Sequence, residues 1–329
     1  MTSRKAALVG RCLLEAQTLS ESLQWRGPIG AMQPIDGATK HGDHLDDAVS
    51  RSDGLSLVWR TDLIFARFDG EVVDRGDHLL VRTRTNPTFW WGNFLLFTYA
   101  PCAGDLERWM ALFDEEIASA QPESRHRAFG IDVRERPRLP PDFTAAGFEL
   151  AEASVLTLTR EQWRAPTGAL PGQFAFQVLD LPHDSAAVVD QQVMADAGRF
   201  EPTGYRVFAE RQMARYAAMQ RAGRGHWFGL VAQVDGRRVL VASCGLFRDV
   251  APGAGDGAGR FQFVSTHPAW RRRGLCTALI HAVCRHGFEA MGLRTLVMVA
   301  DPDDVAIGIY ESVGYRRGAS TWQLERAPR

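Results

Sequence analysis

The segment 264–279 constrains the fold more than any other part of this 329-residue chain. An apolar strand runs through Pro268 into three successive arginines and Gly274, and a helical pattern begins at Leu275. The first four amides of a helix lack intrahelical partners, and the helix dipole is positive at that end. The junction therefore predicts an anion site that fits a diphosphate and needs no metal.

Gly274 has a steric role in this prediction. A residue without a side chain lets the backbone touch the anion, and glycine also tolerates a positive φ. Substitution of Gly274 is therefore expected to weaken anion binding most. The alternative is that the arginines form an exposed basic turn, as runs of charge usually do. The strand before them and the helix after them favour the anion site.

The loop also carries a recognisable pattern. Arg271-x-x-Gly274-x-Cys276, preceded by Thr266-x-Pro268, resembles the Q/R-x-x-G-x-G/A loop that holds the pyrophosphate of acyl-CoA in GNAT acetyltransferases. Cys276 departs from the pattern because it is bulkier than the usual glycine or alanine.

A second pattern follows in the expected order. The segment 301–315 resembles the GNAT signature N-x-x-A-x-x-L-Y-x-x-x-G-F, with Asp303 in place of the asparagine and Ile309 in place of the leucine. Upstream, the segment 227–247 reads as a hairpin that turns at Asp235-Gly236. The acyltransferase unit is then expected over about 170–326.

Composition limits the remaining possibilities. The length favours two domains, and 38 basic against 39 acidic residues give no general reason to expect nucleic-acid or membrane binding. Five cysteines without a C-x-x-C pair encourage neither a disulfide framework nor a zinc site. No apolar run is long enough to span a bilayer, and no secretory leader is recognisable. A cytoplasmic location is the expectation.

The first half divides into two parts. Residues 1–50 read as an extension that is helical at most near 6–23. Over 51–160, the apolar runs 57–68, 78–84 and 89–98 predict strands, and 105–120 predicts a helix. The aromatic segment 89–94 either lines an acceptor pocket or belongs to a core or domain interface.

A short repeated sequence pattern relates this half to the second. The segment 143–148 resembles 310–315, their glycines lie 167 residues apart, and a β-like tail follows each. At the place of the arginine loop, however, the segment 99–108 has no basic triplet and two carboxylates. It resembles the degenerate N-terminal half of tandem GNAT proteins, which implies a structural or acceptor-shaping role.

These observations give a fold class and boundaries. We expect an α/β (α+β) protein of two GNAT-like lobes, each a mixed, mostly antiparallel twisted sheet flanked by helices. The parts are an extension (1–50), a degenerate lobe (51–160) and the acetyltransferase domain (161–329).

The resemblance implies direct transfer of an acetyl group from acetyl-CoA to a primary amine, without a metal. A small-molecule or peptide amine is the expected acceptor, and a monomer or homodimer the expected state. The resemblance also implies a bulge on the strand before the loop, which would present backbone groups to the thioester. The residues expected to bind acetyl-CoA are Phe263, Val264, Thr266, Arg271, Arg272, Arg273, Gly274, Leu275, Cys276, Thr277, Asp303 and Ala306.

Tyr310 occupies the tyrosine position of the second signature and is the candidate for protonating the leaving sulfur, because a phenol with a pKa of about 10 is a donor at neutral pH. The alternative is that it only packs. The strand 260–264 lacks the glutamate that many relatives carry, so the base is open among His267, Glu201 and a chain of water. Two helices over 184–220 would form one wall of the acceptor site.

Three other interpretations stay open. Cys276 at a helix N-terminus is a conceivable nucleophile, although direct transfer argues against it. A non-catalytic acyl-CoA-binding or regulatory module would explain the missing carboxylate. A nucleic-acid patch at the arginines would need several spread cations and a basic domain.

Overall fold

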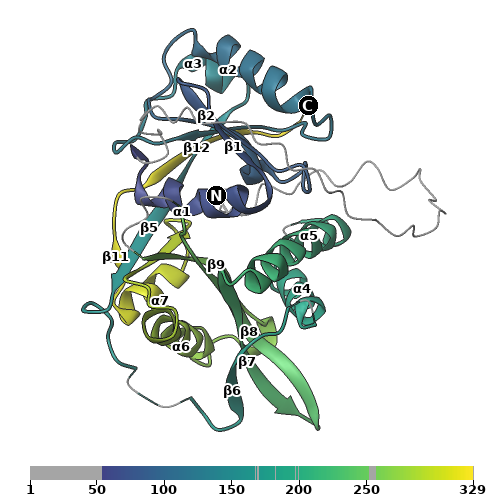
Figure 1. Cartoon of the computed structure of the whole chain (residues 1–329), viewed down its shortest axis with the longest axis vertical. Helices are drawn as coiled ribbons and strands as arrows, with labels where there is room; N and C mark the ends of the chain where they lie inside the picture. The colour runs from purple at the N-terminus through teal and green to yellow at the C-terminus, as the bar shows by residue number, and fades with distance from the viewer. Residues whose placement is uncertain are drawn as a thin grey trace, which may run out of the picture.

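The computed structural model describes residues 54–166, 168, 170–181, 183–196, 198, 200–251 and 257–328. Figure 1 shows two lobes stacked along the long axis of the molecule, with the long strand β5 (Glu149–Thr159) running from one lobe into the other. The expected extension over 1–50, with its helical segment near 6–23, lies outside the described residues.

Both halves of the chain contain helices and strands. The helices are α1 (Leu57–Asp69), α2 (Asp105–Phe113), α3 (Pro141–Ala145), α4 (Ser185–Ala195), α5 (Pro202–Arg221), α6 (Leu275–Glu289) and α7 (Ala306–Val313), with short turns η3 (Trp90–Gly92), η4 (Asp114–Ala118) and η5 (Pro268–Trp270). The strands besides β5 are β1 (Glu71–Asp74), β2 (His78–Arg82), β3 (Asn93–Phe97), β4 (Arg127–Ile131), β6 (Phe174–Val178), β7 (Gly225–Val234), β8 (Arg237–Arg248), β9 (Ala258–Thr266), β10 (Thr295–Ala300), β11 (Arg316–Arg317) and β12 (Thr321–Arg326).

One continuous sheet connects the two lobes. Its strand order is β1-β2-β3-β4-β12-β5-β10-β9-β8-β7-β6, and β11 pairs with β5 beside this path. The pairs β3/β4 and β9/β10 are parallel, and the other pairs are antiparallel. The predicted class, mixed and mostly antiparallel with flanking helices, is confirmed.

The two halves exchange their last strands. Strand β5 ends the first half, but its residues 154–159 pair with β10 of the second half. Strand β12 ends the second half, but it lies between β4 and β5 and pairs with both. The boundary predicted near residue 160 therefore coincides with the end of β5 in sequence, whereas the sheet continues across it. We use "first half" for 54–160 and "second half" for 161–328.

The sequence pattern repeated at 143–148 and 310–315 corresponds to a repeated order of helices and strands. In each half a parallel strand pair is joined through a helix, and a second helix leads into the exchanged strand: β3, α2, β4, α3, β5 in one and β9, α6, β10, α7, β12 in the other. Gly147 and Gly314 follow the equivalent helices α3 and α7, with φ of +89° and +117°. A Cβ on Gly314 would lie 2.2 Å from the Gln162 carbonyl oxygen, so only glycine fits there.

The prediction of a strand over 57–68 is wrong, because these residues form helix α1. Trp59, Leu63 and Ala66 bury one side of it in the core of the first half, whereas Ile64 and Phe65 pack into the core beside α5. A helix between two cores is apolar on two sides, so its sequence reads as a nearly continuous apolar run instead of a single helical stripe.

Partly buried ion pairs also attach α1 to the second half. Arg260 on β9 contacts Asp62 at 3.0 Å, and Arg215 on α5 contacts Asp69 at 2.9 Å. Arg260 also donates to the Thr61 hydroxyl at 3.2 Å. Burial raises the pKa of the Asp62 carboxyl, and the charge of Arg260 opposes that rise.

The remaining local predictions hold with small changes. The hairpin of β7 and β8 turns at Asp235 and Gly236, both with positive φ. The expected pair of helices is α4 and α5, and the helix after the arginine loop is α6. Within 89–98 the strand is shorter than expected, because residues 90–92 form the turn η3 and only β3 follows.

Candidate active site

Strand β9 bulges at the predicted place. Ser265 pairs with Ser243 on β8 and Gln262 pairs with Gly245, so β9 has one extra residue between these pairs. Phe263 lies in the bulge with a φ of +45°, which is uncommon for a residue other than glycine. The bulge interrupts the ladder and leaves backbone groups beside it available for a ligand.

Beyond the bulge, β9 separates from its parallel neighbour. The pairing of β9 with β10 runs from Ala258/Thr295 to Arg260/Val297, although β9 continues to Thr266 and β10 to Ala300. Two parallel strands that part in this way leave unpaired backbone between them. The bulge and the parting strands adjoin, so the second half of β9 is the part of the sheet that is open to a substrate.

The loop after β9 is held by its own side chains. His267 begins the turn η5, and its Nδ1 accepts a hydrogen bond from the Ala269 amide at 3.2 Å. The Arg271 guanidinium donates to the carbonyls of Thr266 at 3.2 Å and Ala195 at 3.0 Å. Arg271 therefore joins the loop to the end of α4 instead of pointing freely at an anion.

The other two arginines are exposed. Arg272 has a φ of +60°, and the Arg273 guanidinium lies 4.8 Å from the centre of the Trp270 ring, a cation–π distance. Their charges give the loop a positive surface next to the first turn of α6.

Gly274 immediately precedes α6 and has a φ of +72°. A Cβ built on it would meet nothing within 4 Å, so the backbone here faces open space. The following amides, of Leu275, Cys276 and Thr277, belong to the first turn of the helix and have no carbonyl four residues earlier within it. The residues present thus fit a diphosphate: a bare backbone, unpaired amides, a positive helix end and adjacent guanidinium groups.

Helix α7 brings Tyr310 to the same region. Its side chain is 6 % exposed, and its ring centre lies 6.1 Å from that of Tyr315. Burial, together with the neighbouring Cys276, Asp304 and Cys244, raises the pKa of the Tyr310 hydroxyl well above its usual value. The hydroxyl therefore keeps its proton at neutral pH.

The residues before α7 organise its start. Asp303 is exposed, and its amide donates to Asp301 Oδ1 at 2.9 Å. The Ala306 amide donates to Asp304 Oδ1 at 2.8 Å. The predicted Asp303 and Ala306 thus lie at the entrance to the helix that carries Tyr310.

Cys276 lies between the loop and Tyr310. Burial and the Asp304 carboxylate raise the pKa of its thiol to about 11, whereas a hydrogen bond with the Thr266 side chain lowers it. A thiol with that pKa is protonated at neutral pH, which argues against Cys276 as a nucleophile.

The two faces of β9 have different neighbours. On one face, Val264 packs against the core with α6 and α7, where Thr266 reaches Cys276. On the other face, Gln262 accepts a hydrogen bond from Tyr216 of α5 at 3.2 Å, and Phe263 packs against the same helix. A ligand at the bulge would have Tyr310 on one side and α4 and α5 on the other.

Backbone amides donate hydrogen bonds to both predicted side-chain bases, Glu201 and His267. Glu201 caps α5 and accepts from the amides of Thr203 at 2.8 Å and Gly204 at 2.6 Å. These hydrogen bonds lower the pKa of the Glu201 carboxyl, so it is a weaker base than an ordinary glutamate. The Nδ1 lone pair of His267 is already used by Ala269.

Sequence reasoning missed two polar groups on the α4 side of β9. Ser243 donates to Gln191 Oε1 at 2.5 Å, and Ser243 is the cross-strand partner of Ser265. Ser265 Oγ and Gln191 Nε2 are both buried without a hydrogen-bond partner among the described residues. A serine two residues past the predicted bulge was a weak signal, and a glutamine on α4 gave none.

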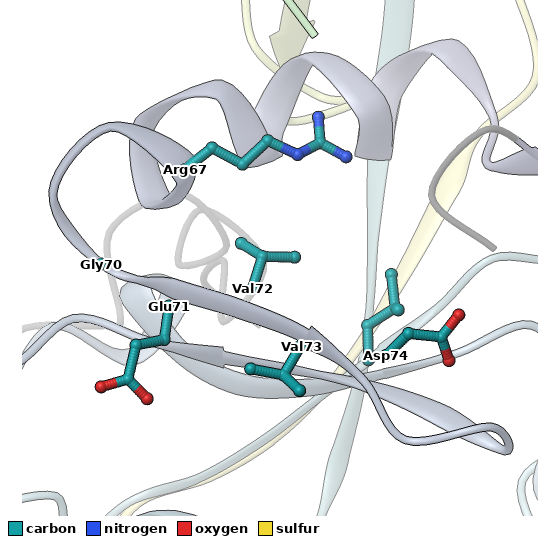
Figure 2. Close-up of a pocket in the computed structure, with 7 residues that line it drawn as sticks. Arg67, Gly70, Glu71, Val72, Val73 and Asp74 are labelled. Carbon is teal, nitrogen blue, oxygen red and sulfur yellow. The ribbon is translucent and has the colours of Figure 1, made fainter. Parts of the chain in front are cut away.

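Two features of the first half lie apart from this site. At the start of α2, Asp105 Oδ2 accepts from the Cys102 amide of the preceding loop at 2.8 Å, so this helix begins with a carboxylate where α6 follows three arginines. Figure 2 shows a hollow between α1 and β1 whose lining contains none of the predicted site residues. Its lining residues are Arg67, Gly70, Glu71, Val72, Val73, Asp74 and Leu79.

Two general properties concern only the described part of the chain. It contains no helix with the length and apolar character needed to cross a bilayer. It also contains no group of three or more His, Cys, Asp or Glu side chains placed to hold a metal ion.

Comparison with known proteins gives a family for the region just described. Residues 193–315 match the acetyltransferase (GNAT) family model. No curated protein matches the sequence.

Solved structures share the fold over most of the chain. A GCN5-related N-acetyltransferase from Kribbella flavida is 17% identical with a TM-score of 0.56, covering 84% of this chain and 96% of its own. A functionally unknown conserved protein from Staphylococcus epidermidis ATCC 12228 is 13% identical with a TM-score of 0.59, covering 80% and 96%. A GCN5-related N-acetyltransferase from Sphaerobacter thermophilus is 17% identical with a TM-score of 0.50, covering 77% and 76%. At these identities the likeness concerns the fold.

Proposed function

Because residues 193–315 belong to the GNAT acetyltransferase family, we propose that the chain transfers an acetyl group from acetyl-CoA to a primary amine by direct attack. The observation that carries the proposal is one continuous arrangement: the bulged β9, the open loop at Gly274, and Tyr310 buried beside them. We propose a small-molecule or peptide amine as acceptor and the cytoplasm as location.

The loop holds the carrier end of acetyl-CoA. The backbone at Gly274 faces open space at the positive end of α6, and Arg272 and Arg273 add charge. Contacts to a diphosphate are made far from the reacting carbon, so they serve mainly to place the thioester beside β9. Arg271 keeps the loop in position through the Thr266 and Ala195 carbonyls.

The bulge serves the thioester. Backbone amides around Phe263 and Val264, released from the ladder, are the donors available to the carbonyl oxygen. Negative charge develops on that oxygen when the amine nitrogen attacks the carbonyl carbon. Donors fixed in place before the reaction are often the largest contribution to catalysis of acyl transfer.

Tyr310 serves the leaving group. When the carbon–sulfur bond breaks, the sulfur takes the bonding electron pair and needs a proton. The Tyr310 hydroxyl, which is protonated at neutral pH, gives its proton to the sulfur, and Tyr310 then recovers a proton from solvent. The general acid is expected to contribute about 10²–10⁴ in rate.

The attacking amine must also lose a proton. Glu201 and His267 are occupied as caps, and Gln262 on β9 is bound to Tyr216. We therefore assign the first step of proton removal to a path through Ser265 Oγ, which is buried on the amine side of the bulge. A path of water from that hydroxyl suits a site whose candidate carboxylate, Glu201, already accepts from backbone amides.

The test is turnover with purified protein, acetyl-CoA and a pool of amines, measured as thiol release and as acetylated product by mass. Tyr310→Phe is expected to retain acetyl-CoA affinity and lose about 10²-fold or more in kcat. Acetyl-CoA binding without thiol release from any amine would instead support the non-catalytic module. A Tyr310→Phe variant with unchanged kcat would remove the assigned acid.

A further inference from the structure

A row of aromatic rings extends from the bulge across α5 to the first half. We call it the aromatic wall: Phe89, Phe200, Tyr205, Phe208 and Phe263. Phe263 lies 6.3 Å from Phe208, Phe208 lies 6.1 Å from Tyr205, and Tyr205 stacks on Phe200 at 5.5 Å, all between ring centres. The row begins at the residue that forms the bulge, so it adjoins the place of the thioester.

The first half contributes Phe89 to the aromatic wall. Phe89 lies 5.3 Å from Phe208, ring centre to ring centre, and it packs against the core beside α5. Its sequence neighbours Trp90 and Phe94 are buried in the core of the first half at 4 % and 1 % exposure. Of these three aromatics in the segment 89–94, Phe89 is therefore the one directed at the second half.

The wall is only partly covered. Tyr205 and Phe208 are buried at 9 % and 5 % exposure, whereas Phe89, Phe200 and Phe263 are half-buried. Phe263 also keeps a positive φ, a conformation that costs energy and that the bulge holds in place. Half-buried rings beside a reaction centre favour an apolar, flat group on the ligand.

The carboxylates near Phe200 in sequence are already used within the fold. The two carboxylates next to Phe200 in sequence are already engaged by backbone amides: Asp196 Oδ2 accepts from Phe200 at 2.9 Å, and Glu201 caps α5. The wall itself consists of rings, which suit a flat apolar group better than a polyamine or an aminoglycoside.

Two buried polar groups beside the wall could contact the amine end of the ligand. Ser265 Oγ and Gln191 Nε2 lie on the same side of β9 as the wall, buried and without partners among the described residues. Gln191 is 1 % exposed, so its unpaired N–H group is retained at an energetic cost. An amine nitrogen at Ser265 would leave its apolar substituent directed along the wall.

We propose that the acceptor is an amine carrying an aromatic or similarly large apolar group, which lies on the aromatic wall while its nitrogen lies at Ser265. This inference rests on the proposed function and names its substrate class. It also gives the first half a direct role, since Phe89 forms one end of the subsite.

The test uses 2-phenylethylamine and the diamine putrescine with the full chain. With CoA present, saturation-transfer NMR is expected to show the phenyl protons of 2-phenylethylamine in contact with the protein. In turnover, kcat/KM is expected to be at least about tenfold higher for 2-phenylethylamine than for putrescine, the ratio that burial of part of a ring provides.

Two variants examine the wall itself. Phe200→Ala and Phe89→Ala are expected to raise KM for 2-phenylethylamine about fivefold to tenfold and to leave KM for acetyl-CoA unchanged. Val207→Ala is the matched control on α5, because Val207 is 41% exposed and is not part of the wall. It is expected to match the unsubstituted protein in both constants.

The outcomes separate the two proposals. A higher kcat/KM for putrescine, or an unchanged KM for 2-phenylethylamine in both wall variants, would overturn the proposal that the acceptor lies on the aromatic wall. Neither result would contradict the proposed acetyl transfer. Absence of phenyl contacts in the NMR experiment would also overturn it. Failure to bind acetyl-CoA in a titration would remove the proposed function and the wall together.

Discussion

Replacement of Gly274 by glutamate examines the anion site most directly. Gly274 has a φ of +72°, and a residue with a side chain pays roughly 1–2 kcal/mol in that conformation. A Cβ there meets nothing within 4 Å, so no clash adds to this cost in the free protein. We expect a fall in Tm of only a few degrees, since 1 kcal/mol corresponds to about 2–4 °C in large domains.

The effect on binding should be far larger. The new side chain occupies the space in front of the amides after Gly274 and places a negative charge beside the diphosphate. Loss of two charge-assisted hydrogen bonds, each about 1.5–3 kcal/mol, corresponds to a rise in Kd of roughly 10²–10⁴-fold. Isothermal titration with acetyl-CoA measures this rise, and calorimetric scanning measures Tm.

Gly236 provides the matched control for this experiment. It also has a φ of +72°, and a Cβ at this position would likewise meet nothing within 4 Å, but Gly236 lies at the tip of the β7/β8 hairpin. Gly236→Glu should therefore show the same small loss of Tm and keep its affinity for acetyl-CoA. If Gly274→Glu binds acetyl-CoA within about threefold of the unsubstituted protein, a difference of less than 1 kcal/mol, the loop is not the diphosphate site.

Three further predictions concern the fold. The fragment 161–329 should aggregate when expressed alone, because it lacks β5, the strand between β10 and β12. Co-expression with the fragment 1–160 should restore a soluble complex on size-exclusion chromatography. A folded, monomeric fragment 161–329 would contradict this prediction. Asp62→Leu should lower the free energy of unfolding in urea by about 3 kcal/mol, because the 8 % exposed Arg260 side chain loses its ion partner, and Asp62→Leu/Arg260→Leu should recover most of it. Burial lowers the pKa of the His126 side chain to about 4, below its ordinary value of about 6.5. The contribution of neutral His126 to the free energy of unfolding is therefore complete above pH 6.5, and about 3 kcal/mol is lost as the pH falls toward 4. In urea titrations His126→Gln should therefore lose less stability than the unsubstituted protein between pH 7 and 4, and equal losses would exclude His126.

Local features of the sequence were sufficient for several elements. The hairpin turn at Asp235-Gly236, the strand, loop and helix over 264–279, and the two helices on either side of residue 200 were all predicted, because turn residues and hydrophobic periodicity act over a few neighbours. The repeat marked by Gly147 and Gly314 was also visible in the sequence.

Helix α1 shows where such reasoning fails. Its residues alternate between two cores, with Leu63 in one and Phe65 in the other, so no single apolar stripe marks it as a helix. The candidate bases show a related limit of sequence reasoning. Glu201 and His267 look like free ionisable groups in the sequence, and only their folded surroundings show that backbone amides engage them.

The sequence by itself determined the loop around Gly274 and the family pattern, since each depends on a short run of residue types, and the family resemblance in turn implied the bulge before the loop. The tertiary structure alone decided that β5 and β12 change places, that Phe89 reaches α5, and that Tyr310 lies beside Cys276. These contacts join residues tens to hundreds of positions apart. They arise from burial of surfaces that become neighbours only when the whole chain has folded.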